Sequence, residues 1–466
     1  MTQQTDLRTE ASAVTEAIAA RAASLRPDDL TSDTIKVAKH CLLDWFAVAL
    51  AGMQEPLSAI LLKEAAEEGG APQATIMGLG ADGSAAKGTV AQAALIHGSA
   101  SHALDFDDVN MTLSGHPTVP VAPVVLALAE HRGLTGRDVV TAFVAGYETE
   151  CRIGALVGPS HYKAGFHATG TIGCFGAAAA AAHLLGLDAA TTAVALGIAG
   201  TQSAGLKSQF GTMCKPLHAG KAAVNGLLAA RLAARGFTGR PDILEANLGF
   251  AKTMSADLDA ERALSEPPYG FHIHDNLFKY HAACYLTHST IDAVRRLADD
   301  NDIAADQVAG IRLHVDPGHF DVCHIAEPTT GLQVKFSLRH TAAMALAGVD
   351  TGRFESYSDA TANRADLVAL RRCVEVSPDG GPGTEARVEM TTNDGGQFSM
   401  TYDVGVPSRD LPDQERRLIG KFNGLVEPLL GSSASDRLRQ RILSLESLDT
   451  IGCLHDDIVR LSRDAA

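Results

Sequence analysis

The sequence predicts a mainly α-helical fold with a second domain of α+β type. Up to about residue 265, apolar residues recur at helical spacing, and each run is closed by glycine or a polar break. After Pro267 and Pro268 apolar and polar residues alternate as in strands, and from about residue 406 the helical spacing returns. We therefore expect helical residues 1–265, an α+β domain at 266–405, and a helical C-terminal part at 406–466.

Composition limits the class of protein. The 466 residues are 46% hydrophobic, which is enough for a large core, and the net charge of −16 disfavours nucleic acid and anionic membranes as partners. The eight cysteines form no C-x-x-C pair and the N-terminus is polar, so we expect a cytoplasmic protein. The most apolar stretch, 168–206, is rich in alanine and glycine, which favours packed buried helices over a membrane span.

The helices of the first part follow one another closely. The first is expected within 7–30, and Asp28, Asp29 or Thr31–Ser32 can cap the next one. The ATIMG run at 74–78 is the single strand-like interruption. The remaining helices of this part are expected at 34–52, 58–70, 90–108, 120–133, 136–154 and 169–186.

The second domain is expected to contain a sheet with helices on one face. Strand-like alternation marks 309–317, and 385–407 reads as a hairpin around the D-G-G turn at 394–396. Helix-like runs lie at 283–299, 335–348 and 363–371.

The segment 97–120 gathers three histidines and three aspartates between two apolar stretches. Read as a helix, it places His102, Asp105 and Asp108 on one face and turns Asp107 elsewhere, while His116 follows in a loop before Pro117. His102, Asp105 and His116 could hold a metal, but their spacing matches no common motif. Structural caps or ion pairs are a second possibility, and a metal-free acid/base site is the interpretation we favour.

Two further segments are suited to anions. In 166–176, His167 and Thr169 stand at the opening of an alanine-rich helix, where free N–H groups attract carboxylates, although the threonine could simply cap. In 205–226, Lys215 and His218 lie near a helix start, an unfavourable place for cations unless they bind a ligand, whereas Lys221 reads as a solvated lysine.

A fourth segment, 272–294, contains Lys279, His281, Cys284 and His288, the last three on one face if the segment is helical. No oxyanion-hole motif supports a cysteine nucleophile, and G-x-S-x-G, Walker A and dinucleotide fingerprints are missing from the sequence. Histidines, lysines and carboxylates without a cofactor fingerprint favour proton transfer at a carbon next to a carboxylate.

These segments, in this order, resemble the MmgE/PrpD family, which includes 2-methylcitrate dehydratases, cis-aconitate decarboxylases and iminodisuccinate epimerase. The resemblance is carried by HALDFDD with GHPT, FHATGTIG, GTMCKPLHAG, FKYHAACYLTH, EPTTGLQVKFSLRHTAAMALAG and KFNGLVEPLLG. It implies a large helical domain built from both chain ends, a smaller inserted α+β lid domain, a homodimer, and a site without metal or organic cofactor.

The resemblance also implies functional positions. Decarboxylase-like site residues fall on Asp105, His116, His167, Lys215 and Lys279, but the chain has Val109 and Cys284 where that pattern has threonine and histidine. We therefore expect four catalytic residues and five substrate-binding residues. The catalytic set is His116, His167, Asp105 and Tyr147, and the binding set is Lys215, Lys279, Thr169, Cys284 and His102.

The expected activity is a cofactor-free hydro-lyase that acts on a small di- or tricarboxylate and resembles 2-methylcitrate dehydratase. An epimerase of an iminodisuccinate-type dicarboxylate is the alternative. The departures at Val109 and Cys284 speak against cis-aconitate decarboxylase. A metal-dependent lyase and a non-catalytic anion-binding protein complete the alternatives.

Overall fold

The computed structural model describes residues 14–79, 85–454, 456 and 458. Its contacts divide the chain into two compact units, one formed by Met1–Asn276 with Asp410–Ala466 and the other by Leu277–Arg409. The first unit is helical and takes both ends of the chain, and the second contains a sheet, so the predicted fold class is confirmed. The beginning of the helix expected at 7–30 lies outside the described residues.

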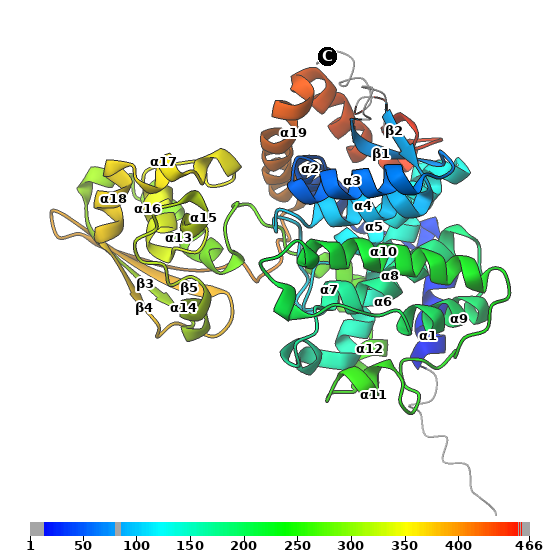
Figure 1. The fold of residues 1–466 in the computed structure, drawn as a ribbon. Coiled ribbons are helices and arrows are strands. Elements are labelled where there is room, and N and C mark those ends of the chain that lie inside the picture. The colour runs from blue at the N-terminus through cyan, green and yellow to red at the C-terminus, as the bar shows by residue number, and fades with distance from the viewer. Residues whose placement is uncertain (1–13, 80–84, 455, 457, 459–466) are drawn as a thin grey trace, which may run out of the picture. The chain divides into compact units, whose positions relative to one another are not determined.

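Helices α8 and α10 lie at the centre of the first unit, where α8 packs against α5, α6 and α10 (Figure 1). The helices of this unit are α1 (Val14–Ser24), α2 (Ser32–Gly52), α3 (Pro56–Glu68), α4 (Val90–Ser101), α5 (Thr118–Arg132), α6 (Gly136–Lys163), α7 (Ala168–Thr171), α8 (Gly173–Leu184), α9 (Ala189–Gly200), α10 (Cys214–Ala233), α11 (Phe250–Met254), α12 (Ala260–Leu264) and α19 (Leu411–Leu443).

Helix starts follow the capping residues in the sequence. Thr31 caps α2 by accepting a hydrogen bond from the Thr34 N–H at 3.1 Å, as predicted, and Thr89 and Thr135 form capping boxes at α4 and α6. The C-terminal helix α19 packs along α2, whose apolar residues are almost all buried. The core of the first unit is therefore formed by helices from both the N-terminal and the C-terminal parts of the chain.

Two glycines let α4 and α10 approach each other closely. A Cβ on Gly220 would lie 2.3 Å from the Leu95 carbonyl oxygen, and one on Gly98 would lie 2.8 Å from the Gly220 Cα. Only glycine fits at this crossing, since real Cβ atoms do not come that near to backbone. The crossing brings the end of α4 and the start of α10, both rich in titratable residues, to the same region.

The alanine-rich helices α8 and α9 are buried as predicted. Within the described ranges, no single helix is both long and apolar enough to cross a membrane, and only α2 and α3 pass that test jointly, with an 82° bend between them.

Two predictions about the first unit are wrong. The strand β1 (Ala74–Leu79) pairs with a second strand, β2 (Ala85–Gly88), in an antiparallel hairpin that the sequence pattern did not indicate. Helix α4 ends at Ser101 and does not continue to 108. His102, Asp105 and Asp108 therefore share no helix face, and Asp105 adopts a left-handed φ of 51°.

The second unit contains a four-stranded sheet in the order β4-β3-β5-β6, with β3 and β4 parallel and the other neighbours antiparallel. Its strands are β3 (Val308–Val315), β4 (Val374–Ser377), β5 (Glu385–Thr392) and β6 (Gln397–Asp403), and its helices are α13 (His288–Asp300), α14 (Pro317–Val322), α15 (Gly331–Val334), α16 (Leu338–Leu346), α17 (Asp359–Ala362) and α18 (Ala365–Arg372).

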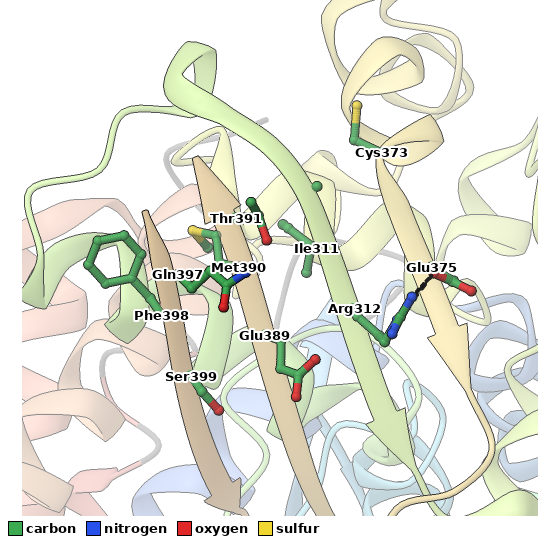
Figure 2. Close-up of a pocket in the computed structure, with 11 residues that line it drawn as sticks. Ile311, Arg312, Cys373, Glu375, Glu389, Met390, Thr391, Gln397, Phe398 and Ser399 are labelled. Carbon is green, nitrogen blue, oxygen red and sulfur yellow. Dashed lines mark hydrogen bonds and ion pairs between the residues drawn. The ribbon is translucent and has the colours of Figure 1, made fainter. Parts of the chain in front are cut away.

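Apolar side chains of α13 and α16 form one core with the inward residues of β3 and β5, including Ile291, Leu313 and Val388. The predicted hairpin is confirmed as β5–β6, whereas β4 was not predicted and the helix expected from 283 begins at His288. A hollow of about 590 Å³ lies over the strands (Figure 2). Charged side chains that line this hollow are already paired, as Arg312 is with Glu375 at 2.9 Å. We therefore do not assign the hollow as the functional site.

Candidate active site

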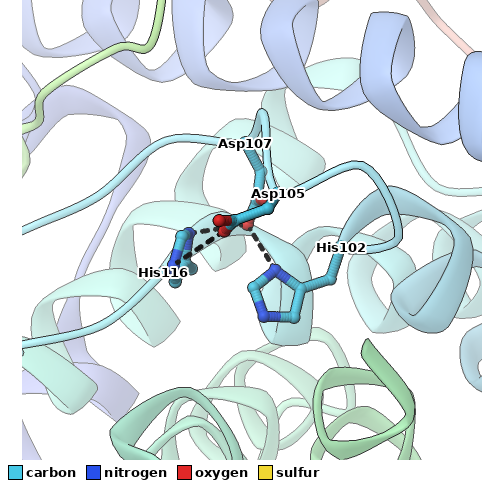
Figure 3. Close-up of side chains that lie close together, drawn as sticks. All are labelled: His102, Asp105, Asp107 and His116. Atoms are coloured by element: carbon cyan, nitrogen blue, oxygen red, sulfur yellow. Dashed lines mark hydrogen bonds and ion pairs between the residues drawn. The ribbon is translucent and has the colours of Figure 1, made fainter. Parts of the chain in front are cut away.

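Three segments of the first unit bring histidines and carboxylates together. They are the loop that follows α4, the start of α7, and the first turns of α10. Figure 3 shows the centre of the group, where His102, Asp105, Asp107 and His116 converge.

Asp107 is the central carboxylate. Its Oδ2 accepts a hydrogen bond from Nδ1 of His102 at 2.9 Å and lies 2.9 Å from Nδ1 of His116. Burial alone would raise the pKa of Asp107, but the two imidazoles outweigh it and hold the pKa well below its usual range. Asp107 is therefore ionised at neutral pH and orients both rings.

His102 connects the cluster to the next histidine. Burial lowers its pKa to about 4, against the opposing pull of Asp107, so the ring is neutral at pH 7. The ring stacks on His167 with centroids 5.5 Å apart and meets His116 edge-on at 4.6 Å. With Nδ1 engaged by Asp107, Nε2 of His102 is left as a buried nitrogen without a hydrogen-bond partner among the described residues.

His167 and His218 extend the row of imidazoles. Their Nδ1 atoms lie 3.0 Å apart, which requires one to donate and the other to accept. Burial, followed by the charges of His102 and other neighbours, lowers the pKa of His167, and burial and Lys215 lower the pKa of His218. Burial therefore disfavours the charged forms of these imidazoles in the free protein.

The rim of the cluster carries the charged groups. Nζ of Lys215 donates to Oδ1 of Asp105 at 2.7 Å, and Nε2 of His116 lies 3.8 Å from the same oxygen. The Asp105 side chain is 53% exposed, whereas those of His116 and Lys215 are 12% and 14% exposed. An incoming carboxylate could therefore replace Asp105 beside the lysine without a large desolvation cost.

Hydrogen bonds fix the loop that carries His116. Asn110 and Gly115 exchange backbone bonds across it, and the His116 N–H donates to Oγ1 of Thr169 at 3.0 Å. Asn110 also donates through Nδ2 to the Tyr147 hydroxyl at 3.1 Å, which itself donates to Oδ1 of Asn276 at 2.8 Å. Thr169 and Tyr147 thus support the loop from two sides.

Tyr147 is fully buried, and burial raises the pKa of its hydroxyl well above the usual value. Both hydrogen-bonding roles of the hydroxyl are occupied by asparagines. Through these contacts Tyr147 anchors the loop that contains Asn110. A proton-carrying role for Tyr147 stays a prediction.

The backbone at Phe106 is held by a residue from the C-terminal helix. Lys421 of α19 donates to the Phe106 carbonyl at 2.6 Å, lies 3.9 Å from the centroid of its ring, and pairs with Asp44 at 2.5 Å. Nearby, Thr118 donates to Asp108, whose pKa burial and Asp44 raise to about 8. Lys421 therefore fixes the segment from which Asp105 and Asp107 project.

The start of α7 offers fewer free amides than the sequence pattern indicated. The N–H groups of Gly170 and Thr171 both donate to the His167 carbonyl, at 2.9 and 3.0 Å. The short helix ends at Thr171 before α8 begins at Gly173. Substrate binding by Thr169 stays a prediction, and its described contact is the bond that positions His116.

Lys279 and Cys284 belong to the second unit. Lys279 is buried, and Cys284 is half-buried with a thiol contact to Cys323, whose pKa is raised by that contact and by burial. Because α13 begins at His288, His281, Cys284 and His288 do not share a helix face as predicted. The binding roles of Lys279 and Cys284 stay predictions.

The cluster could also hold a divalent cation. His102, Asp105, Asp107 and His116 can each offer one ligand atom, all within 4.8 Å of one another, and imidazole with carboxylate suits several metals. The Lys215 ammonium, 2.7 Å from Oδ1 of Asp105, competes for the same place. The expectation of a metal-free site stays a prediction that chelation can test.

Six of the nine predicted site residues therefore lie within this region: His102, Asp105, His116, His167, Thr169 and Lys215. The sequence interpretation missed Asp107 as a functional residue and named His218 without including it in the site. Gly115 and Pro117 placed His116 in a loop, but nothing in the spacing showed that this loop returns His116 to Asp107.

A mainly helical fold with an imidazole–carboxylate centre and a rim lysine defines a protein equipped for acid–base chemistry on an anionic ligand. Comparison with family models matches the MmgE/PrpD N-terminal domain at residues 16–263 and the MmgE/PrpD C-terminal domain at 281–447. The chain belongs to the MmgE/PrpD family.

Similar curated proteins share about a quarter of their residues with this chain. A cis-aconitate decarboxylase of Aspergillus terreus is 27% identical over 97% of both chains. A cis-aconitate decarboxylase-like protein of Aspergillus oryzae is 28% identical over 91% of this chain and 92% of its own. The human cis-aconitate decarboxylase is 28% identical over 78% of each chain.

Proposed function

We propose that this protein is a lyase that removes a proton next to a carboxylate of a small di- or tricarboxylate. The observation that carries the proposal is the Asp107–His116 contact at 2.9 Å beside the Lys215–Asp105 rim. The first pair supplies an oriented base, and the second supplies a cation for a substrate carboxylate.

His116 is the proposed base. With Nδ1 directed at the ionised Asp107, its Nε2 is the nitrogen that faces Asp105 and Lys215. The imidazolium that forms after proton abstraction is stabilised by the carboxylate of Asp107, as in other oriented histidines. Asp105 moves aside or turns when the substrate carboxylate takes its place at Lys215.

His167 is the proposed acid, with His102 beside it; because burial lowers the pKa of His167 in the free protein, it takes up its proton together with the substrate before it donates. In a hydro-lyase reaction the α-proton goes to His116 and a carbon–carbon double bond forms. The β-hydroxyl leaves as water with a proton from the acid, so atoms and charges balance. Lys279 and Cys284 complete the proposed binding set, and no metal or organic cofactor is included.

Decarboxylation is the second candidate. The fungal and human relatives, which are named cis-aconitate decarboxylases, favour it, while Val109 and Cys284 depart from the decarboxylase pattern. Dehydration of a 2-methylcitrate-like substrate therefore remains our first proposal. Epimerisation of an iminodisuccinate-type dicarboxylate would need two groups on opposite faces of one carbon to exchange a proton.

Proton NMR in D2O separates these reactions. Purified protein would be incubated with citrate, 2-methylcitrate, cis-aconitate and an iminodisuccinate-type diacid, with and without EDTA. New vinyl signals with loss of water support dehydration, loss of carbon dioxide supports decarboxylation, and deuterium incorporation with inversion supports epimerisation. A His116→Gln variant should lose whichever activity is seen, and inactivity of the natural protein on every compound would contradict the proposal.

We also propose a homodimer in the cytoplasm. The dimer follows from the family resemblance, and the compartment from cysteines without paired spacing. Sedimentation velocity at micromolar concentration tests the first proposal, and a monomer over the whole concentration range would overturn it.

A further inference from the structure

A second hollow in the first unit is lined by basic side chains from the ends of two helices, with a leucine from the end of a third. Its volume is about 400 Å³, and the helices α5, α8 and α10 meet around it through their C-terminal turns. His131 and Arg132 come from α5, and Arg231 and Arg235 from the end of α10. No acidic residue lines the hollow among the described residues, although the chain as a whole carries a net charge of −16.

Among the residues that the structure describes, no carboxylate pairs with the arginines of this hollow. Throughout the described ranges no ion pair involves Arg132, Arg231 or Arg235, and the Arg235 guanidinium donates only to the Arg231 carbonyl, at 3.0 Å. The carboxylate of Glu130, which precedes His131 in the sequence, accepts a hydrogen bond from the Thr75 hydroxyl at 2.6 Å. Burial, and to a smaller degree the neighbouring Arg235, lower the pKa of Arg231.

Helix ends alone do not account for so much positive charge. Each helix C-terminus carries roughly half a negative charge, so three ends amount to about −1.5. The three arginines each carry a full positive charge, which leaves an excess of about +1.5 in a concave surface. Such an excess is unfavourable in the free protein and becomes favourable when an anion binds.

We propose that this hollow binds a phosphate-bearing small molecule. Planar guanidinium groups match the oxygens of phosphate in paired hydrogen bonds, and several of them can surround a multiply charged group. The volume lies within the range of small-molecule sites, and Leu128 and Leu185 supply an apolar wall for an organic moiety. The hollow contains none of the residues of the candidate active site and does not depend on the proposed function.

Isothermal titration calorimetry on the full chain tests the proposal with inorganic pyrophosphate, ADP and citrate as separate probes. Pyrophosphate or ADP should bind to the natural protein, and the Arg231→Gln/Arg235→Gln variant should bind roughly tenfold or more weakly. The Arg137→Gln/Arg353→Gln variant removes the same charge from exposed surface and should bind like the natural protein. Lys215→Ala should also leave this binding unchanged.

The single variant Arg235→Gln guards against misfolding, because its side chain is exposed and makes one hydrogen bond. It should weaken binding severalfold with an unchanged circular dichroism spectrum. ADP binding tighter than pyrophosphate would assign a role to the apolar wall. Failure of both phosphate probes to bind, equal binding by the double variant, or loss of binding in Lys215→Ala would each overturn the proposal.

Discussion

Oδ2 of Asp107 lies 2.9 Å from Nδ1 of His116, and the same oxygen accepts the hydrogen bond of His102. One buried carboxylate therefore fixes two imidazoles whose planes differ by 63°. Removing its charge while keeping its shape should affect both rings.

Asp107→Asn should reduce kcat by roughly 10²–10⁴-fold, because an amide cannot stabilise the imidazolium that His116 forms. Steady-state kinetics on the substrate found by NMR measures this effect. Asp105→Asn, at the exposed rim, should change KM more than kcat. Full kcat in Asp107→Asn would exclude His116 as the base in this orientation.

Lys215→Ala should raise KM about tenfold or more, since a substrate carboxylate loses its charge-assisted hydrogen bond. Lys221→Ala, on the exposed side of the same helix, is the matched control and should leave KM unchanged. Equal effects of the two substitutions would indicate general electrostatic attraction and no specific contact.

Tyr147→Phe distinguishes an anchor from a proton carrier. Loss of the hydroxyl leaves Asn110 and Asn276 without a buried partner, so stability should fall by about 1–3 kcal/mol. Urea unfolding measures that loss. If the hydroxyl only anchors the loop, the pH dependence of kcat keeps its shape, whereas disappearance of one limb of the profile would identify a proton carrier.

Lys421→Met should destabilise the protein by about 3–5 kcal/mol, because it removes the ammonium that pairs with the buried Asp44 carboxylate. The Lys421→Met/Asp44→Asn variant should recover part of this loss, as both charges are then gone. Chemical denaturation followed by circular dichroism gives both values. A double variant less stable than Lys421→Met would contradict a compensating ion pair.

Stability should be greatest at mildly acidic pH. The folded pKa of His102, His272 and His340 is about 4 in each case, below the ordinary 6.5, so the stability that depends on their neutral forms is lost as pH falls from 6.5 toward 4. Burial and Asp44 raise the pKa of Asp108 to about 8. The stability that depends on its protonated form is therefore lost as pH rises from the ordinary pKa of a carboxyl group toward 8.

Thermal unfolding at pH 4 to 9 tests this dependence. Asp108→Asn should flatten the decline on the alkaline side and make the rise between pH 4 and 6.5 steeper, because the Asp108 contribution is lost across both ranges. A natural protein whose Tm keeps rising up to pH 9 would show that Asp108 does not stay protonated in the fold.

Sequence patterns predicted the parts of the fold that local spacing determines. Helices such as α2 and α5 have caps and apolar runs that need no tertiary information, and the D-G-G turn specifies the β5–β6 hairpin. Strand β4 was missed because four residues are too few to show alternation, and its pairing with β3 is a long-range contact.

The geometry of the site depended on contacts that spacing cannot show. Helical periodicity continues past Ser101, but α4 ends there, Asp105 takes a left-handed conformation, and Lys421 holds the Phe106 carbonyl. As a result, the side chain of Asp107 is buried and that of Asp105 is exposed. The residue types of the site were predictable, and the assignment of roles to the aspartates was not.

The bond from Lys421 to the Phe106 carbonyl spans 315 positions of the chain. At synthesis rates of roughly 5–20 residues per second, Lys421 emerges about 15–60 s after Phe106. Until then Asp44 lacks its ion pair with Lys421, and the loop of Asp105 and Asp107 has no support from α19. The nascent chain can therefore form its early helices during translation but acquires an ordered acid–base centre only near the end, which makes premature termination inactivating even when most of the first unit has been made.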